Sequence, residues 1–193
     1  MKSGCCIIGL AMAALLALVL APGLAHAQEE DATGTFSRLQ YSAIGGIMSG
    51  VGPQGRTLGR GPAVMFNVHG ESTIGMELGL EAAYAASNDN LNTTFTSAGL
   101  IARLSPTPED YRAYVQLGAS IYHVTFSPDL PGIVAPENTT RPGGSFGLGL
   151  ELFDRAHFTI GGLVTYNGVV VAHNASRSYL LAGVTLTFKP SPY

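Results

Sequence analysis

Apolar residues alternate with small or polar residues along most of the chain beyond residue 35, and this period of two constrains the fold most. Successive side chains of a strand point to opposite faces, so the alternation predicts strands with one apolar face. Eight such segments are separated by clusters of Gly, Pro, Asn and Asp. They cover residues 36–48, 61–70, 74–86, 92–105, 110–126, 143–153, 157–168 and 177–188. No segment after residue 27 keeps a helical period, so we expect an all-β fold.

The first 27 residues have the pattern of a cleaved signal peptide. Lys2 supplies a positive charge, an apolar run extends from Cys5 to Leu20, and residues 25–27 read Ala-His-Ala, a small-x-small cleavage site. Both cysteines of the chain precede the cleavage site. The exported chain is therefore expected to have no disulfide and no thiolate for catalysis or metal binding.

The charge content of the chain is low. Asp, Glu, Lys and Arg make up 12% of the residues, about half of the roughly 25% found in soluble domains. A disordered chain needs high charge and low hydrophobicity, whereas 46% of these residues are hydrophobic. The formal net charge of −3 also argues against nucleic acid as a partner.

The connections between the predicted strands alternate in length. The odd-numbered ones, which cover residues 49–60, 87–91, 127–142 and 169–176, tend to be longer than the tight turns between them. In an up-and-down barrel, all odd connections lie at one rim and all even connections at the other. Short turns at one rim and long loops at the other are typical of bacterial outer-membrane barrels. We therefore predict an eight-stranded antiparallel up-and-down transmembrane β-barrel with its long loops outside the cell.

The residue types indicate which face of each strand points inward. In the third predicted strand, Leu78 and Leu80 share a face, and Glu77, Gly79 and Glu81 share the other. A solvated face would carry many Lys and Glu, but the polar faces here are mostly Gly, Ser, Thr and Gln. Small side chains suit the narrow interior of an eight-stranded barrel. We therefore expect the apolar faces to contact lipid, and the same register places two apolar residues, Ile101 and Leu181, inside.

Six charged residues in or beside the strands fall on the polar faces and nearly balance one another. A buried ion needs a partner, so we expect them to form a polar network that fills the lumen in place of a wide channel. The predicted network consists of Arg38, Glu77, Glu81, Arg103, Arg112 and Glu151.

The last predicted strand carries a further signal. Residues 183–188 read Gly-Val-Thr-Leu-Thr-Phe, and this pattern of Gly183, Leu186 and Phe188 resembles the C-terminal β-signal of outer-membrane proteins. With the leader, the strand count and the loop pattern, it makes the chain similar to the small eight-stranded bacterial outer-membrane β-barrel family (OmpA/OmpX-like). The resemblance implies an outer-membrane location and recognition of these three residues by the assembly machinery.

The resemblance also implies contact with outer-membrane lipid and lipopolysaccharide, and a monomeric barrel. It divides the chain into a signal peptide (1–27), a short periplasmic segment (28–35), the barrel (36–188) and a C-terminal tail (189–193). Aromatic residues near strand ends could form interfacial girdles or simply pack within the sheet. They are Tyr41, Tyr84, Tyr111, Phe126, Tyr166 and Tyr179.

Histidines near the long-loop rim are the only candidates for catalysis, with His123, His173 and Ser176 as the residues concerned. A nucleophilic serine needs a histidine within hydrogen-bond reach. Neither histidine matches the His-x-Ser arrangement of lipid A deacylases, because position 125 is Thr and Ser176 lies three residues after His173. His69 and Glu71 face the lumen without a third metal ligand, so we expect hydrogen bonding there, and no metal site or cofactor.

Three functions remain open at this point. The favoured one is an outer-membrane barrel with a structural or surface-interaction role. The first alternative is an enzyme that modifies lipid A or phospholipid through His123 or His173. The second alternative is a soluble periplasmic, lipocalin-like binder of an apolar ligand, which requires the inverse arrangement of the two faces.

Overall fold

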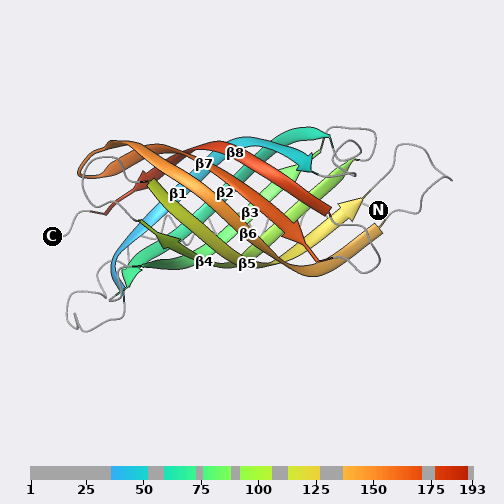
Figure 1. The fold of residues 1–193 in the computed structure, drawn as a ribbon, viewed down its shortest axis with the longest axis horizontal. Coiled ribbons are helices and arrows are strands. Elements are labelled where there is room, and N and C mark those ends of the chain that lie inside the picture. The colour runs from blue at the N-terminus through green and yellow to red at the C-terminus, as the bar shows by residue number, and fades with distance from the viewer. Residues whose placement is uncertain are drawn as a thin grey trace. The chain divides into compact units, whose positions relative to one another are not determined.

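The computed structural model describes residues 36–51, 59–72, 76–87, 92–105, 113–126, 137–170 and 177–190. Eight strands account for nearly all of these residues (Figure 1). They are β1 (Phe36–Val51), β2 (Arg60–Ser72), β3 (Glu77–Ala86), β4 (Thr93–Leu104), β5 (Ala113–Phe126), β6 (Glu137–Asp154), β7 (Phe158–Val169) and β8 (Arg177–Phe188). In these ranges no helix is long and apolar enough to cross a membrane. The predicted signal peptide and the segment 28–35 lie outside the described residues, as do residues 191–193 of the tail.

The eight strands form a closed barrel in sequence order. β1 pairs antiparallel with β8, from Tyr41 opposite Phe188 to Val51 opposite Ser178. Closure leaves no strand edge unpaired, which is what allows a sheet to lie in hydrocarbon. The predicted fold class is confirmed.

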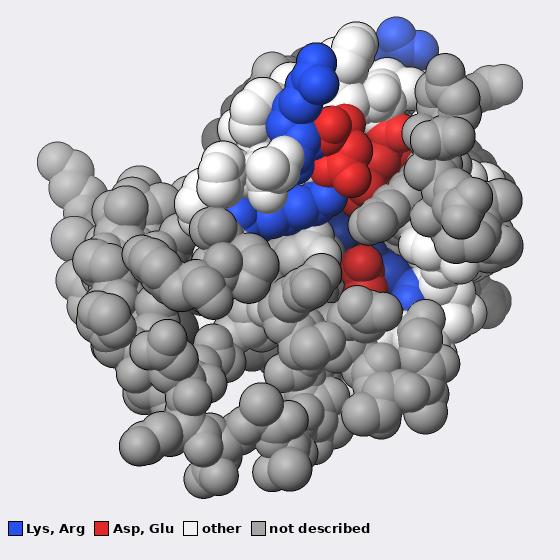
Figure 2. Space-filling model, turned by 90° about the vertical axis from the view of Figure 1, so that its left-hand side faces the viewer, with Lys and Arg blue, Asp and Glu red and all other residues white. Residues whose placement is uncertain are grey.

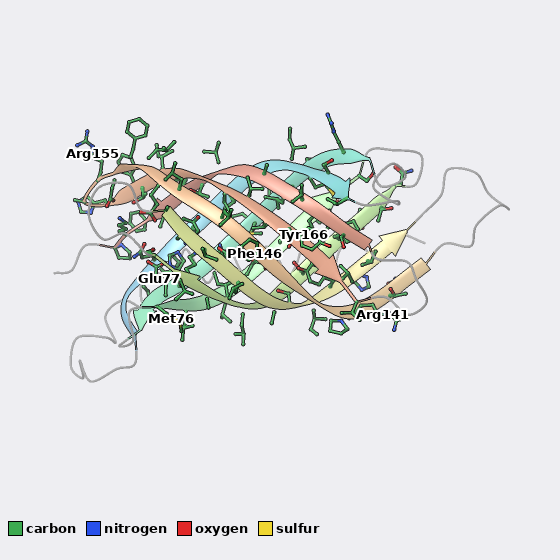
Figure 3. The ribbon with its side chains drawn as sticks, viewed as in Figure 1. Met76, Glu77, Arg141, Phe146, Arg155 and Tyr166 are labelled. Carbon is green, nitrogen blue, oxygen red and sulfur yellow. The ribbon has the colours of Figure 1, made fainter. Side chains whose placement is uncertain are left out.

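The two rims of the barrel differ less than the loop lengths predicted. The fifth strand begins at Ala113 and not at residue 110, so the connection before it (105–112) is as long as the one between β1 and β2 (52–59). We call the rim at the β2–β3, β4–β5 and β6–β7 connections the short-turn end, and the opposite rim the long-loop end. In Figure 3, Glu77 and Arg155 mark the short-turn end and Arg141 the long-loop end. β1 enters and β8 ends at the short-turn end, since Tyr41 pairs with Phe188 there.

The sixth strand starts earlier than the alternation predicted. β6 begins at Glu137, so the expected loop 127–142 is wrong in its last six residues. The β-branched residues Thr139 and Thr140 pair with Val124 and His123 and extend the hairpin beyond the Gly-rich segment. Pro142 has no N–H to donate, but its carbonyl accepts a 2.9 Å hydrogen bond from the Val170 backbone, so the proline does not end the strand.

The predicted orientation of the two faces is confirmed. Leu117, Leu148 and Val184 point outward and are 47%, 57% and 62% exposed. Ile101 and Leu181, the two apolar residues expected inside, are fully buried. The inverse arrangement required by a lipocalin-like binder is therefore contradicted, because a barrel with such an exterior would present a large apolar surface to water.

The glycines of β6 make room for aromatic side chains in the lumen. A Cβ atom on Gly149 would overlap the ring of Tyr114, and one on Gly143 would lie 2.7 Å from Cε2 of Tyr122. Real Cβ atoms are not found so close to a ring carbon. The inner face of β6 is thus a flat surface on which two tyrosines of β5 lie.

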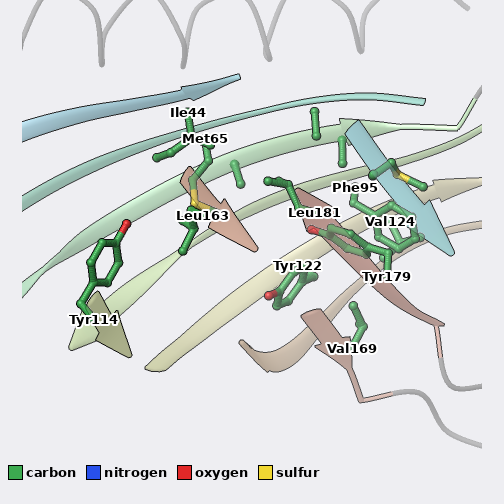
Figure 4. Packing of buried hydrophobic residues seen from close by; sticks show 14 residues of the cluster. Ile44, Met65, Phe95, Tyr114, Tyr122, Val124, Leu163, Val169, Tyr179 and Leu181 are labelled. Atoms are coloured by element: carbon green, nitrogen blue, oxygen red, sulfur yellow. The ribbon is translucent and has the colours of Figure 1, made fainter. Parts of the chain in front are cut away.

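The lumen contains a larger apolar cluster than the sequence indicated. Most of it lies between the middle of the barrel and the long-loop end, and Tyr114 at the start of β5 extends it toward the short-turn end (Figure 4). Near the long-loop end, the rings of Phe95 and Tyr179 pack with centroids 4.7 Å apart. The suggestion that Tyr179 belongs to an interfacial girdle is wrong, because it shares the inward face of β8 with Leu181. The cluster includes Ile44, Met48, Met65, Phe95, Tyr122, Val124, Leu163, Val169, Tyr179 and Leu181.

Candidate functional site

Polar and charged side chains gather in the lumen toward the short-turn end of the barrel. Figure 2 looks at this end and shows acidic and basic side chains together. The described members come from six strands, and we call them the polar cluster. They are Ser42, Asn67, His69, Glu77, Glu81, Arg103, Gln116 and Thr187.

Arg103 of β4 is the centre of the polar cluster and is almost completely buried. Its Nε donates to Oε1 of Gln116 at 2.9 Å, and a terminal nitrogen donates to Nε2 of His69 at 2.7 Å. With the Asn67 amide turned so that its oxygen faces Arg103, the other terminal nitrogen donates to it at 2.8 Å. The ring of Tyr114 lies 4.8 Å from the guanidinium carbon, a cation–π distance. The buried cation is thus held mainly by neutral groups.

Glu81 is joined to Arg103 through an intermediate residue. Gln116 accepts from Arg103 with its oxygen and donates from Nε2 to Oε2 of Glu81 at 2.9 Å. Gln116 is absent from the predicted network, because that network is built from charged residues alone. The alternation of inward and outward side chains along β5 is the sequence signal that places Gln116 on the inward face.

The Arg103 contact fixes the protonation pattern of His69. A guanidinium can only donate, so Nε2 of His69 must accept, and the ring proton lies on Nδ1. Nδ1 is 3.1 Å from Oε2 of Glu77, so the carboxylate lies beside this N–H. The expectation that His69 hydrogen-bonds within the lumen agrees with these contacts, while the side chain of Glu71 lies outside the described residues.

Ser42, His69 and Glu77 lie in the order of a hydrolase triad. Ser42 Oγ is 3.1 Å from Nε2 of His69 and 2.8 Å from Oγ1 of Thr187. A triad needs the Nε2 lone pair to take the serine proton. Here Arg103 already donates to that lone pair. The arrangement therefore acts as a hydrogen-bonded packing unit, and it does not activate Ser42.

The predicted network residues are only partly described. Glu77, Glu81 and Arg103 face the lumen as expected, and Glu151 lies half-buried on the inward face of β6. Arg112 and the side chain of Arg38 lie outside the described residues. The contacts among the described members include two neutral residues, Asn67 and Gln116, that the charge pattern did not select.

The candidate catalytic residues are not brought together in the described part of the chain. His123 lies on the outer face of β5, where its Nδ1 is 3.1 Å from Oγ1 of Thr140. His173 and Ser176 lie outside the described residues. Across the described ranges, no group of three or more His, Cys, Asp and Glu side chains could hold a metal ion.

The fold and the side-chain orientation define the class of protein: a small eight-stranded barrel of the outer-membrane type. No family model matches the chain, and no curated protein matches it either. The chain is similar to the crystal structure of Neisserial surface protein A (NspA), with a TM-score of 0.61 and 13% identity over 79% of this chain and 97% of that one.

Two Pseudomonas aeruginosa structures are also similar. The outer membrane protein OprG gives a TM-score of 0.53 at 11% identity, over 83% of this chain and 99% of that one. The N-terminal β-barrel domain of OprF gives 0.51 at 13% identity, over 80% and 98%. The neighbours are outer-membrane proteins of Gram-negative bacteria, in agreement with the location predicted from the sequence. At these identities the likeness concerns the fold.

Proposed function

We propose that this chain is an outer-membrane barrel with a structural or surface-interaction role, whose lumen is filled by side chains and does not form a wide pore. The observation that carries the proposal is the division of side chains between the two faces. Large apolar residues such as Leu100, Phe146 and Leu148 are exposed on the outside, while charged and aromatic residues are buried inside. This division is stable when the outer face of the barrel contacts membrane hydrocarbon.

Two layers of side chains support a closed lumen. The polar cluster around Arg103 occupies the part nearer the short-turn end, and the apolar cluster around Phe95 and Tyr179 occupies the part nearer the long-loop end. An eight-stranded barrel is only wide enough for its side chains to fill it. Met48, Met65, Tyr122 and Leu181 are each fully buried, as expected for filled space.

The same division of side chains determines which residues the assembly machinery and lipid can reach. Leu186 and Phe188 are 52% and 54% exposed on the outer face, where the assembly machinery and lipid can contact them. Gly183 has a second reason to be glycine, because a Cβ atom there would lie 2.7 Å from the carbonyl oxygen of Gly45. Outer-membrane lipid and lipopolysaccharide are the proposed surroundings, and the closed barrel is proposed to be a monomer.

The enzyme alternative has less support. His123, its first candidate, contacts Thr140 on the outer face and neither a serine nor a carboxylate in its described hydrogen bond. An enzyme would therefore have to use His173 with Ser176. Alanine substitution of both His123 and His173, followed by analysis of membrane lipids, tests it, and unchanged lipids would support the non-enzymatic role.

Two measurements test the proposal itself. Cell fractionation should recover the protein with the outer membrane and release it only with detergent. Purified protein in a planar bilayer should give no conductance comparable to that of a 16-stranded porin run in parallel. Recovery in the periplasm without detergent would overturn the location, and porin-like conductance would overturn the filled lumen.

A further inference from the structure

Six polar side chains form two rows on the outer face of β4, β5 and β6, close to the long-loop end. Thr94, Thr125 and Asn138 lie opposite one another in the ladders, and Thr96, His123 and Thr140 form the next row. Thr140 and Asn138 are exposed, and the others are half-buried. We call these six residues the hydroxyl patch.

The hydroxyl patch begins where the apolar exterior ends. The next row toward the short turns is Ala98, Ile121 and Pro142, and β6 then stays apolar or small on its outer face as far as Leu152. Ten residues at about 3.3 Å each, tilted by about 40°, correspond to a height of about 25 Å. This is about the height of the apolar band of such barrels, so the patch lies just beyond the hydrocarbon.

The hydroxyl patch spans three adjacent strands of the barrel, β4, β5 and β6. On the outer face of β7 and β8, the hydroxyl of Tyr166 donates to Oγ of Ser178 at 2.9 Å, and Val170 and Leu180 nearby are 63% and 39% exposed. The β6–β7 ladder starts at Gly143, whereas the β5–β6 ladder continues to Glu137. The patch therefore forms a continuous polar surface over three strands, whereas the hydroxyls on β7 and β8 bond to each other.

The chemistry of the patch matches a sugar better than an ionic group. It contains four hydroxyls, an amide and an imidazole, but no Asp, Glu, Lys or Arg. Hydroxyls and amides both donate and accept hydrogen bonds, as sugar hydroxyls do. The contact between His123 Nδ1 and Thr140 uses only one of the two ring nitrogens. A phosphate-binding surface would instead carry Arg or Lys.

We propose that the hydroxyl patch binds the saccharide headgroup of lipopolysaccharide in the leaflet at the long-loop end. This inference rests on the proposed outer-membrane role and names a partner for one defined surface. Each neutral hydrogen bond contributes only modestly, so the partner is held by several weak contacts along β4, β5 and β6.

The test compares the wild type with the triple variant Thr96→Val, His123→Leu and Thr140→Val. The thermal midpoint of the heat-modifiable gel shift is measured in three bilayers: phospholipid alone, phospholipid with lipopolysaccharide, and phospholipid with dephosphorylated lipopolysaccharide. We expect both lipopolysaccharides to raise the wild-type midpoint by several degrees, because a ligand that binds only the folded state stabilises it. The triple variant should lose at least half of that rise and should match the wild type in phospholipid alone.

A matched control changes three outer-face residues outside the patch, Ile47→Val, Leu80→Val and Val184→Leu, and should keep the full rise. A triple variant that keeps the rise would overturn the assignment to the patch. Loss of the rise after dephosphorylation would overturn the sugar in favour of phosphate. If the wild type inserts into the bilayers but lipopolysaccharide does not raise its thermal midpoint, the inference is overturned and the outer-membrane proposal is not. Failure to insert into any bilayer would overturn both.

Discussion

A terminal nitrogen of Arg103 lies 2.7 Å from Nε2 of His69, and this one contact determines how the inner part of the barrel is organised. It leaves the histidine proton on Nδ1, toward Glu77, and it removes the base that Ser42 would need for nucleophilic catalysis. The same guanidinium reaches Gln116 and, through it, Glu81. Arg103 thus connects groups from four other strands.

Replacement of Arg103 by Met should be strongly destabilising. Glu81 and Glu77 would remain buried or half-buried without the cation, and loss of one partner from a buried charged network costs about 3–5 kcal/mol. Urea unfolding of the barrel in bilayers would measure the loss in the free energy of unfolding. The control Arg60→Met removes an exposed arginine and should change the free energy by less than about 0.5 kcal/mol. Equal midpoints for the two variants would contradict the central role of Arg103.

Gly149→Ala should destabilise the barrel through steric overlap. The new methyl group would meet the ring of Tyr114, and overpacking of a filled interior costs about 1–3 kcal/mol. Gly45→Ala provides the control, because a Cβ atom there meets no atom within 4 Å. The double variant Gly149→Ala with Tyr114→Leu should recover part of the loss in thermal midpoint. Equal midpoints for the two single variants would show that the Tyr114 ring moves freely.

The fold could be predicted because the alternation recurs in eight segments and because long and short connections tend to alternate between them. The outward position of Leu148 and the inward position of Leu181 both follow from parity within a strand. The start of β6 could not be predicted in this way, because residues 137–141 are polar on both faces. A strand that extends beyond the hydrocarbon no longer needs an apolar face. Apolar and polar residues therefore stop alternating there, and the strand cannot be recognised from its sequence.

The site was less predictable than the fold. Charge alone selected Glu77, Glu81 and Arg103, but the network also needs neutral partners that only the cross-strand geometry identifies. Gln116 contacts Arg103 because β4 and β5 place these two residues opposite each other. Strand register is set by the turns and by the side-chain pattern of both paired strands, so it is not encoded in either strand alone.

Leu148→Arg tests the orientation of the barrel in the membrane. Leu148 points outward near the middle of the apolar exterior of β6, and an arginine at the bilayer midplane costs about 2–4 kcal/mol. We expect a lower free energy of unfolding in bilayers by that amount. His157→Arg provides the control at the exposed β6–β7 turn, where the cost should fall to about 0–1 kcal/mol. Similar effects at the two positions would contradict lipid contact at Leu148.

Phe158 and Phe188 separate a role in assembly from a role in stability, because they pair directly across β7 and β8 and are similarly exposed, at 42% and 54%. Only Phe188 belongs to the segment that resembles a C-terminal β-signal. Alanine at either position should lower the free energy of unfolding of the refolded barrel by a similar amount, since each removes a half-exposed ring at the same rim. In cells, only Phe188→Ala should reduce the amount of heat-modifiable barrel in the outer membrane, because the assembly machinery would no longer recognise the last strand. Equal losses of assembled protein for the two variants would mean that the rim needs the aromatic pair for stability alone.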